Sequence, residues 1–256
     1  MYGRGYRSPG GLGFGPTFTP PIVMRLLIAN VAVFFAQVFT SGAFDGLAAI
    51  SPIKLWRAGY LWQPFTYMWL HGGLGHLLMN MFVLWMFGSQ LAMAWGASRF
   101  LRYYLICGVG AGLIIGTVPL LLVGLHVAPP FILTIPTVGA SGAIYGVLLA
   151  YSLTWPDRTI MLIFPPVAFR AIWLIPILFF MSALFPGAGN VSHVGHLGGV
   201  VVGWFYLRRQ GDTDGKLISW EQLKFKLRRW RMRRRLRAVQ YEEWEARRRE
   251  HDRRYH

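Results

Sequence analysis

Long stretches without charge constrain this chain more than any other feature of its sequence. The first 207 of its 256 residues contain only eleven charged side chains, nine Lys or Arg and two Asp. About 20 consecutive apolar residues are enough for a helix to cross a bilayer, and the chain contains several stretches that approach this length. We therefore expect an all-α, multi-pass membrane protein rather than a water-soluble domain.

Six membrane-spanning helices can be delimited from the apolar stretches. They are predicted at residues 22–40, 75–95, 100–123, 141–155, 168–184 and 193–207. The segment 41–73 is too long for a turn and carries Trp56, Tyr60, Trp62 and Trp69. Aromatic rings with a polar edge favour the headgroup level, so we expect this segment to be an interfacial loop after the first helix.

Both ends of the chain differ in composition from the six-helix domain predicted at 21–208. Residues 1–20 are rich in Gly and Pro and predict a flexible arm. Residues 208–256 hold 17 of the 26 Lys and Arg, and most of the net charge of +16 lies there. The predicted organisation is therefore an arm at 1–20, the helical domain at 21–208 and a basic tail at 209–256.

The tail pattern predicts a basic amphipathic helix. Ser219 and Gln222 form a capping box, and apolar residues follow at helical spacing among Arg and Lys: Trp220, Leu223, Leu227 and Trp230. We expect this helix to lie on anionic lipid, with a solvated charged helix as the alternative. Nucleic acid is not an expected partner, because a helix tethered at a membrane meets lipid first.

The positions of Lys and Arg predict the orientation in the membrane. One side of the six-span topology carries the tail together with Arg4, Arg7, Arg25, Arg99, Arg102, Arg158 and Arg170. The other side carries only Lys54 and Arg57. Because loops rich in Lys and Arg stay in the cytoplasm, both termini are expected there, in a membrane that we expect to be a bacterial plasma membrane.

Polar side chains begin three of the predicted spans from the same, outer side. His76 and Asn80 lie in the first turns of the second span, Ser141 begins the fourth, and His196 lies in the first turn of the sixth. Polar groups within spans are usually functional, although an N-cap serine or interhelical hydrogen bonds would also explain them. His193, one turn before His196, is the other candidate base.

Small residues recur every four positions in two of these spans. They are Gly142, Gly146 and Ala150 in the fourth, and Gly195, Gly199 and Gly203 in the sixth. Such spacing makes a groove along one helix face and lets two backbones approach closely in lipid. If the two grooves meet, Ser141 and His196 meet at the outer end. The fourth span, about 22 Å long against an apolar core of about 30 Å, would begin below the surface in a depression open to water.

Three motifs on these spans resemble those of the rhomboid family of intramembrane serine proteases. They are His71-Gly-Gly-Leu-Gly-His76-Leu-Leu-Met-Asn80, Gly139-Ala140-Ser141-Gly142, and His196 followed by Gly199 and Gly203. The resemblance covers about 22–207, and three motifs in the right order make it far more specific than the serine motif alone. It implies a six-helix bundle whose site opens to water from the outer side.

The resemblance also implies roles for single residues. Ser141 would be the nucleophile and His196 the general base, and Tyr145 would pack against that histidine. The Ser141 backbone N–H, His76 and Asn80 would hold the oxyanion, while His71 would brace the surface loop by hydrogen bonds. Gly139, Gly142, Gly199 and Gly203 would support the site. The substrates would be single-span membrane proteins, and no cofactor or metal is expected.

Two positions depart from the family pattern, and other functions remain as alternatives. Gln63 stands where many members have Arg, and Ala92 where they have Glu, which puts the anchoring of the loop in doubt.

A non-catalytic relative that binds membrane clients is the main alternative. A zinc protease is excluded by the lack of a His-Glu-x-x-His run, and an aspartyl protease by the position of Asp45 and Asp157, the only acidic residues before the tail.

Overall fold

The computed structural model describes residues 15–161, 167–184, 193–209, 228 and 232. The chain divides into two units, 1–211 and 212–256, and the first holds the features discussed below. The amphipathic helix predicted in the tail lies almost wholly outside the described residues. Within the first unit, every predicted span overlaps at least one helix.

The helices of the first unit have well-defined bounds. They are α1 (Pro21–Phe39), α5 (Leu74–Val83), the π-helical turn η2 (Leu84–Gly88), α6 (Ser89–Trp95), α7 (Ala97–Gly124), α8 (Ser141–Thr154), α9 (Leu174–Leu184) and α10 (His193–Arg209). Three segments of the described chain are long and apolar enough to cross a membrane: Pro21–Phe39, Leu74–Trp95 and Ala97–Gly124. α8 is shorter, with 14 residues, in agreement with the short fourth span that was predicted.

The fifth predicted span begins as a short strand rather than as a helix, which corrects its start within a mostly helical fold. Strands β1 (Thr159–Met161) and β2 (Ala168–Arg170) pair antiparallel, with Thr159 opposite Arg170 and Met161 opposite Ala168. A single 3-10 turn, η4 (Ala171–Trp173), then leads into α9. A short apolar stretch fits a strand as well as a helix, so hydrophobicity alone placed the start of the helix too early.

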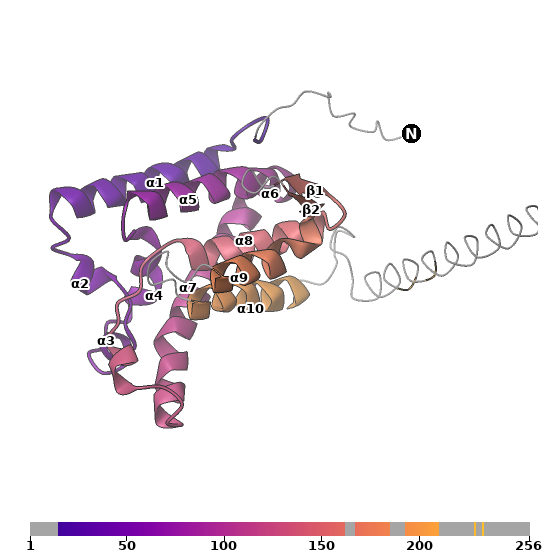
Figure 1. The fold of residues 1–256 in the computed structure, drawn as a ribbon. Coiled ribbons are helices and arrows are strands. Elements are labelled where there is room, and N and C mark those ends of the chain that lie inside the picture. Colours follow the sequence, from indigo (N-terminus) through magenta and orange to yellow (C-terminus); the bar gives the residue numbers. More distant parts are fainter. Residues whose placement is uncertain (1–14, 162–166, 185–192, 210–227, 229–231, 233–256) are drawn as a thin grey trace, which may run out of the picture. The chain divides into compact units, whose positions relative to one another are not determined.

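Helices α7, α8 and α10 pack against one another at the centre of the unit. In Figure 1, α8, α9 and α10 lie side by side, and α7 crosses behind them. Two buried tyrosines fix this packing: Tyr67 Oη donates to the Gly108 carbonyl (2.8 Å), and Tyr103 Oη donates to the Gly146 carbonyl (2.7 Å). α1 packs beside α5 at the edge of this group (Figure 1).

The loop between α1 and α5 folds into short helical turns. They are α2 (Asp45–Ala48), α3 (Pro52–Trp56), α4 (Gln63–Thr66) and η1 (Tyr67–Trp69), and η3 (Pro130–Leu133) lies in the loop before α8. An isolated bridge between Ile50 and Thr137 joins the two loops. The loop that was predicted to lie at the interface is thereby tied to the segment that leads into Ser141.

Gln63 anchors this loop although the family's usual arginine is missing. Its side chain is fully buried, its Oε1 accepts from the Ser51 N–H (3.3 Å), and its Nε2 donates to the Leu47 carbonyl (3.2 Å). Ala92, the second departure, is buried as well. The loop is therefore held by hydrogen bonds of a neutral amide.

The predicted arm is described only from Gly15 onward. Trp85 Nε1 donates to Thr19 Oγ1 (2.9 Å), and Pro20 is buried. A Cβ on Gly15 would overlap the Trp85 ring, so this glycine lies flat against the indole. Gly15 and Thr19, shortly before α1, thus contact Trp85 of η2.

Candidate active site

Helices α8 and α10 approach each other backbone to backbone, as their glycine spacing predicts. A Cβ on Gly199 would overlap the Gly142 carbonyl oxygen, and a Cβ on Gly146 would lie 3.3 Å from the Gly199 carbonyl oxygen. Only glycine allows so close a contact. The amino-terminal ends of the two helices therefore lie together, and these ends carry Ser141 and His196.

Gly203, the last glycine of the α10 series, packs against α7, although its four-residue spacing had predicted a contact with α8. A Cβ on Gly203 would meet Tyr103 Oη and lie 3.3 Å from Cys107 Sγ, both on α7. A Cβ on Gly146 would lie 2.5 Å from the same sulfur. The glycine face of α10 therefore packs on α8 near the site and on α7 further along.

Ser141 occupies the first position of α8 and does not act as its N-cap. The N-cap is Ala140, which has no side chain able to cap, and Ser141 itself is partly exposed. The preceding Gly139 donates its backbone N–H to the Tyr67 carbonyl (2.9 Å), which fixes the entry into the helix. The structure thus leaves the Ser141 hydroxyl free of the structural role that a serine at a helix start most often has.

The imidazole of His196 is held by ring stacking. It lies on the ring of Tyr145, with centroids 4.0 Å apart and planes 12° apart, and Phe179 of α9 meets the same tyrosine edge-on at 5.4 Å. His196 is buried, and its Nδ1 has no hydrogen-bond partner among the described residues. His193, in contrast, is exposed at the first position of α10.

His76 Nε2 adjoins the same space beside Gly139 as the serine hydroxyl. The Gly72 backbone N–H donates to His76 Nδ1 (3.3 Å), so the proton of a neutral imidazole resides on Nε2. A Cβ on Gly139 would lie 2.9 Å from His76 Nε2 and 3.8 Å from Ser141 Oγ. The space beside Gly139, whose φ is +127°, therefore adjoins both a hydrogen-bond donor and the hydroxyl.

Asn80 lies one turn after His76 and is nearly buried. Its Nδ2 donates to the His76 carbonyl (3.1 Å) within α5. An amide nitrogen carries two hydrogens, so this bond leaves Asn80 one further donor. His76 and Asn80 share the face of α5 that their spacing of four predicts.

His71 braces the loop through its backbone rather than through its imidazole. Its N–H donates to Gln37 Oε1 (2.9 Å), and Gln37 Nε2 donates to the His71 carbonyl (3.4 Å) and to Asp45 Oδ1 (3.1 Å). Both imidazole nitrogens are buried without a hydrogen-bond partner in the described structure, and the ring meets His76 edge-on at 5.3 Å. Burial, and to a lesser extent His76, lowers the pKa of His71 to about 4.

Two contributors to this arrangement were not identified from the sequence. Gly72 acts through its backbone N–H, which no residue-type pattern reveals. Gln37 is a polar residue inside an apolar helix, and its position in the last turns of α1 could have marked it as a structural or functional residue. Together they hold the segment that precedes α5 and orient His76.

Comparison with known proteins places these residues in a family. The sequence model of the Rhomboid domain matches residues 58–209. Rhomboid protein 1 of Saccharomyces cerevisiae, a mitochondrial protein, is 34% identical over 146 residues, covering 53% of this chain and 38% of the yeast protein. The rhomboid protease GluP of Bacillus subtilis is 29% identical over 216 residues, covering 80% of this chain and 38% of GluP.

The relatives differ in how much of their length this chain covers. RHOMBOID-like protein 2 of Arabidopsis thaliana is 27% identical over 234 residues, covering 75% of this chain and 68% of the plant protein. The matched region is 38% of the yeast protein and 38% of GluP, so the chain spans less than half the length of both. The candidate residues all fall within the matched domain.

Proposed function

Because the chain belongs to the rhomboid family, we propose that it is an intramembrane serine endopeptidase that uses Ser141 and His196 as a catalytic dyad. The observation that carries the proposal is the contact of Gly142 with Gly199, which joins the ends of α8 and α10 that bear the two residues. The described part of the chain contains mainly helices, of which three are long and apolar enough to span a membrane. We extend this to six spans, with both termini in the cytoplasm.

In the proposed mechanism, Ser141 Oγ attacks the carbonyl carbon of the scissile bond. His196 accepts the hydroxyl proton as the new C–O bond forms, and it returns this proton to the leaving amine when the C–N bond breaks. Nδ1 of His196 is buried, so Nε2 is the nitrogen assigned to the transfer. Water then hydrolyses the acyl-enzyme by the same proton route.

The tetrahedral oxyanion is assigned to donors beside Gly139. The candidates are the Ser141 backbone N–H, which opens α8, the Nε2–H of His76 and the remaining N–H of Asn80. The amino terminus of a helix also favours negative charge. A donor of this kind typically contributes about 10²–10³ in rate.

Tyr145 is assigned a positioning role rather than a chemical one. Its ring face sets the plane of the His196 imidazole, and Phe179 supports the tyrosine from α9. An acidic third member is not required in this proposal, because stacking and burial orient the base. We propose that single-span membrane proteins are the substrates and that the basic tail lies on anionic lipid.

The test is cleavage by the full chain reconstituted in liposomes with a panel of single-span substrates. We expect cleavage and fluorophosphonate labelling by the natural protein. Ser141→Ala should abolish both, and His196→Ala should abolish cleavage while the protein remains folded. His193→Ala is the matched control and should retain activity.

A non-catalytic, client-binding protein is the second candidate. It would give neither cleavage nor labelling in the natural protein, yet would still co-purify with membrane clients. Cleavage that persists in Ser141→Ala would remove the serine mechanism.

A further inference from the structure

The end of α7 and the residues that follow it present a surface that is both apolar and uncharged. The sequence contains no Asp, Glu, Lys or Arg between Arg102 and Asp157. α7 ends at Gly124, and residues 121–135, which we call the α7 extension, include its last turn, the following loop and η3. Four large apolar side chains of this extension are at least 60% exposed: Leu121, Leu125, Val127 and Phe131.

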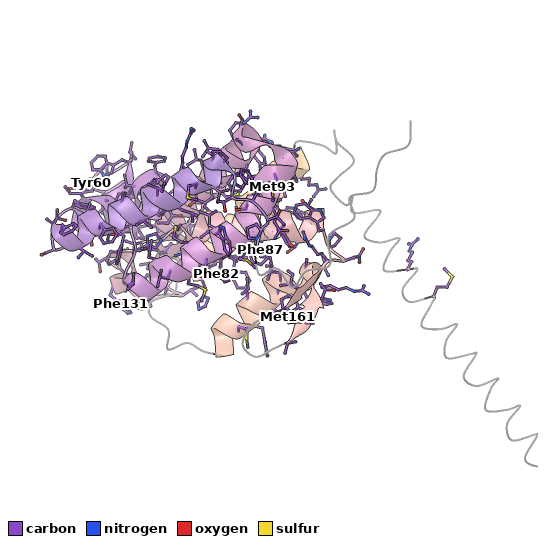
Figure 2. All side chains as sticks on the ribbon, turned by 90° about the horizontal axis from the view of Figure 1, so that it is seen from above. Tyr60, Phe82, Phe87, Met93, Phe131 and Met161 are labelled. Carbon is purple, nitrogen blue, oxygen red and sulfur yellow. The ribbon has the colours of Figure 1, made fainter. Side chains whose placement is uncertain are left out.

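The α7 extension leaves the helical group sideways. In Figure 1, α1, α5 and α8 run in one direction, and α7 crosses that direction, so that its last turns project away from these helices beside α3. Figure 2 shows Phe131 on the outside of the helical body. α1 and the segment Leu74–Trp95 are long and apolar enough to cross a membrane. An element that crosses their direction therefore projects along the plane of a bilayer rather than out into water.

The backbone of the α7 extension satisfies most of its own hydrogen bonds. The N–H groups of residues 125–128 all donate to carbonyls in the last turns of α7. Two prolines without an N–H follow, and Ile132 and Thr134 then donate to the carbonyls of Pro129 and Phe131. Thr134 Oγ1 donates to the Phe131 carbonyl as well (2.8 Å). A loop in water can leave its donors to the solvent, whereas a segment in lipid has to satisfy them internally.

The inner side of the α7 extension is fixed to the rest of the unit. Leu133 of η3 is buried, and the bridge between Thr137 and Ile50 joins the residues after the extension to the loop after α1. α3 packs against α7, where a Cβ on Gly116 would overlap the Leu55 side chain. The exposed apolar side chains therefore belong to a segment that is held in place by the protein.

We propose that the α7 extension is a lipid-docking surface whose exposed apolar side chains lie among the acyl chains around the helical bundle, close to the headgroup level. The extension is continuous with α7, which is itself long and apolar enough to cross a membrane. A surface without charge offers a water-soluble partner no electrostatic complementarity, whereas acyl chains require none.

One residue sets the depth of this surface. His126 is exposed among the apolar side chains, and an imidazole needs water or a phosphate as a hydrogen-bond partner. Irregular backbone is likewise unsuited to the hydrocarbon centre when it faces lipid. Both features place the extension at the boundary between acyl chains and headgroups. The proposal requires a chain embedded in a bilayer but not a catalytic one, so its failure would leave the proposed dyad untouched.

Depth in the bilayer is the first test. Leu125→Cys and Phe131→Cys are labelled with an environment-sensitive fluorophore in the full chain in vesicles, and the natural protein, whose Cys107 is buried, supplies the blank. Leu113→Cys, 44% exposed within α7, is the reference in lipid, and Asp157→Cys, 63% exposed after α8, is the reference in water.

The proposal predicts a distinct quenching pattern for the two labelled positions. Lipids brominated near the headgroup end of their chains should quench the label at 125 and 131, and lipids brominated deeper should quench it most at 113. Aqueous iodide should quench the label at 157 several-fold more than at 125 or 131. Iodide quenching at 125 and 131 equal to that at 157 would overturn the proposal.

A second copy of this chain is the other occupant that an apolar surface could have. Oxidative cross-linking of the Leu125→Cys protein in vesicles, at falling ratios of protein to lipid, distinguishes the two. We expect no more disulfide dimer than for Asp157→Cys. A dimer that persists on dilution with lipid, together with the loss of quenching by brominated lipids, would assign the surface to a second copy and reject lipid.

Apolar character should be what keeps the extension in lipid. In the Phe131→Cys protein, the pair Leu125→Glu and Val127→Glu should raise iodide quenching at position 131 several-fold, because a carboxylate favours water over acyl chains. The pair Leu125→Met and Val127→Ile keeps the surface apolar and should leave the quenching unchanged. Equal quenching in the two proteins would contradict the proposal.

Discussion

The imidazole of His196 and the phenol ring of Tyr145 lie face to face, with centroids 4.0 Å apart and planes 12° apart. The two residues come from different helices, so the orientation of the proposed base depends on the packing of α8 on α10. No carboxylate is needed to define this orientation. In the proposed mechanism, the stacked ring takes the orienting role that an aspartate has in a three-residue serine protease site.

The ring face of Tyr145, not its hydroxyl, should therefore matter for activity. Tyr145→Phe keeps the stacked ring and should retain kcat within about twofold, whereas Tyr145→Ala should lower kcat by about tenfold. Initial rates with a single-span substrate in liposomes measure both. A phenylalanine variant as weak as the alanine variant would assign the effect to the hydroxyl.

The backbone contact between α8 and α10 should tolerate no methyl group. Gly199→Ala places a Cβ against the Gly142 carbonyl, and overpacking of this kind costs about 1–3 kcal/mol. Gly75→Ala in α5 meets no atom within 4 Å and should be neutral or stabilising by up to about 1 kcal/mol. Thermal unfolding in detergent compares the two. Equal unfolding temperatures would contradict so close a helix contact.

Gly139 should act through His76. Gly139→Ala brings a Cβ to 2.7 Å from His76 Cε1 at a φ of +127°, so we expect the ring to be displaced and activity to fall by about 10²–10³. The double variant with His76→Ala should be no less active than His76→Ala alone, because both remove one donor. If the losses of activity from Gly139→Ala and His76→Ala multiply in the double variant, the two residues act independently and the prediction is wrong. Gly124→Ala, in open space at the end of α7, is the control.

Gln63 should be needed for the stability of the loop after α1. Gln63→Met keeps the length of the side chain but leaves the Ser51 N–H and the Leu47 carbonyl without this partner. An unsatisfied buried group costs about 1–3 kcal/mol, so the unfolding temperature should fall. Arg57→Met, exposed in the same loop, should change stability by no more than about 0.5 kcal/mol. A fall of the same size in both would deny Gln63 its anchoring role.

Acid should weaken the fold through His71. Its pKa in the folded protein, about 4, is below its ordinary value of 6.5, so the unfolded chain takes up the proton first. Stability is therefore complete above pH 6.5 and is lost as the pH falls toward 4, by about 3 kcal/mol at most. Chemical unfolding in detergent from pH 7.5 to pH 4.5 should show a flatter pH dependence for His71→Asn. The same slope in both proteins would contradict the assignment to His71.

Much of the helical arrangement follows from hydrophobicity and small-residue spacing. The apolar stretches placed the helices, because a run of this length has few other ways to satisfy its backbone in lipid. The four-residue glycine repeats predicted the contact of Gly142 with Gly199, since only a bare backbone allows it. The short α8 followed from the position of Ser141 and of Trp155 at its two ends.

The features that the sequence did not predict depend on tertiary contacts or on the backbone. The strands at Thr159 and Ala168 share their composition with the start of a helix, and only their pairing distinguishes them. The orientation of His76 depends on a peptide N–H of Gly72, which has no signature in the sequence. Gln63 anchors its loop by geometry that a family comparison of residue types had placed in doubt.

The π-helical turn at Leu84–Gly88 links α5 to α6 without a break, and its i→i+5 hydrogen bonding is equivalent to one residue added to an α-helix. Removing a single residue there would rotate everything before it by about 100° relative to everything after it. His76 and Asn80 would then be turned away from the space beside Gly139 although their own sequence was unchanged. The direction in which the two proposed oxyanion donors point is thus set about two turns further along the helix, by one extra residue in the π-helical turn.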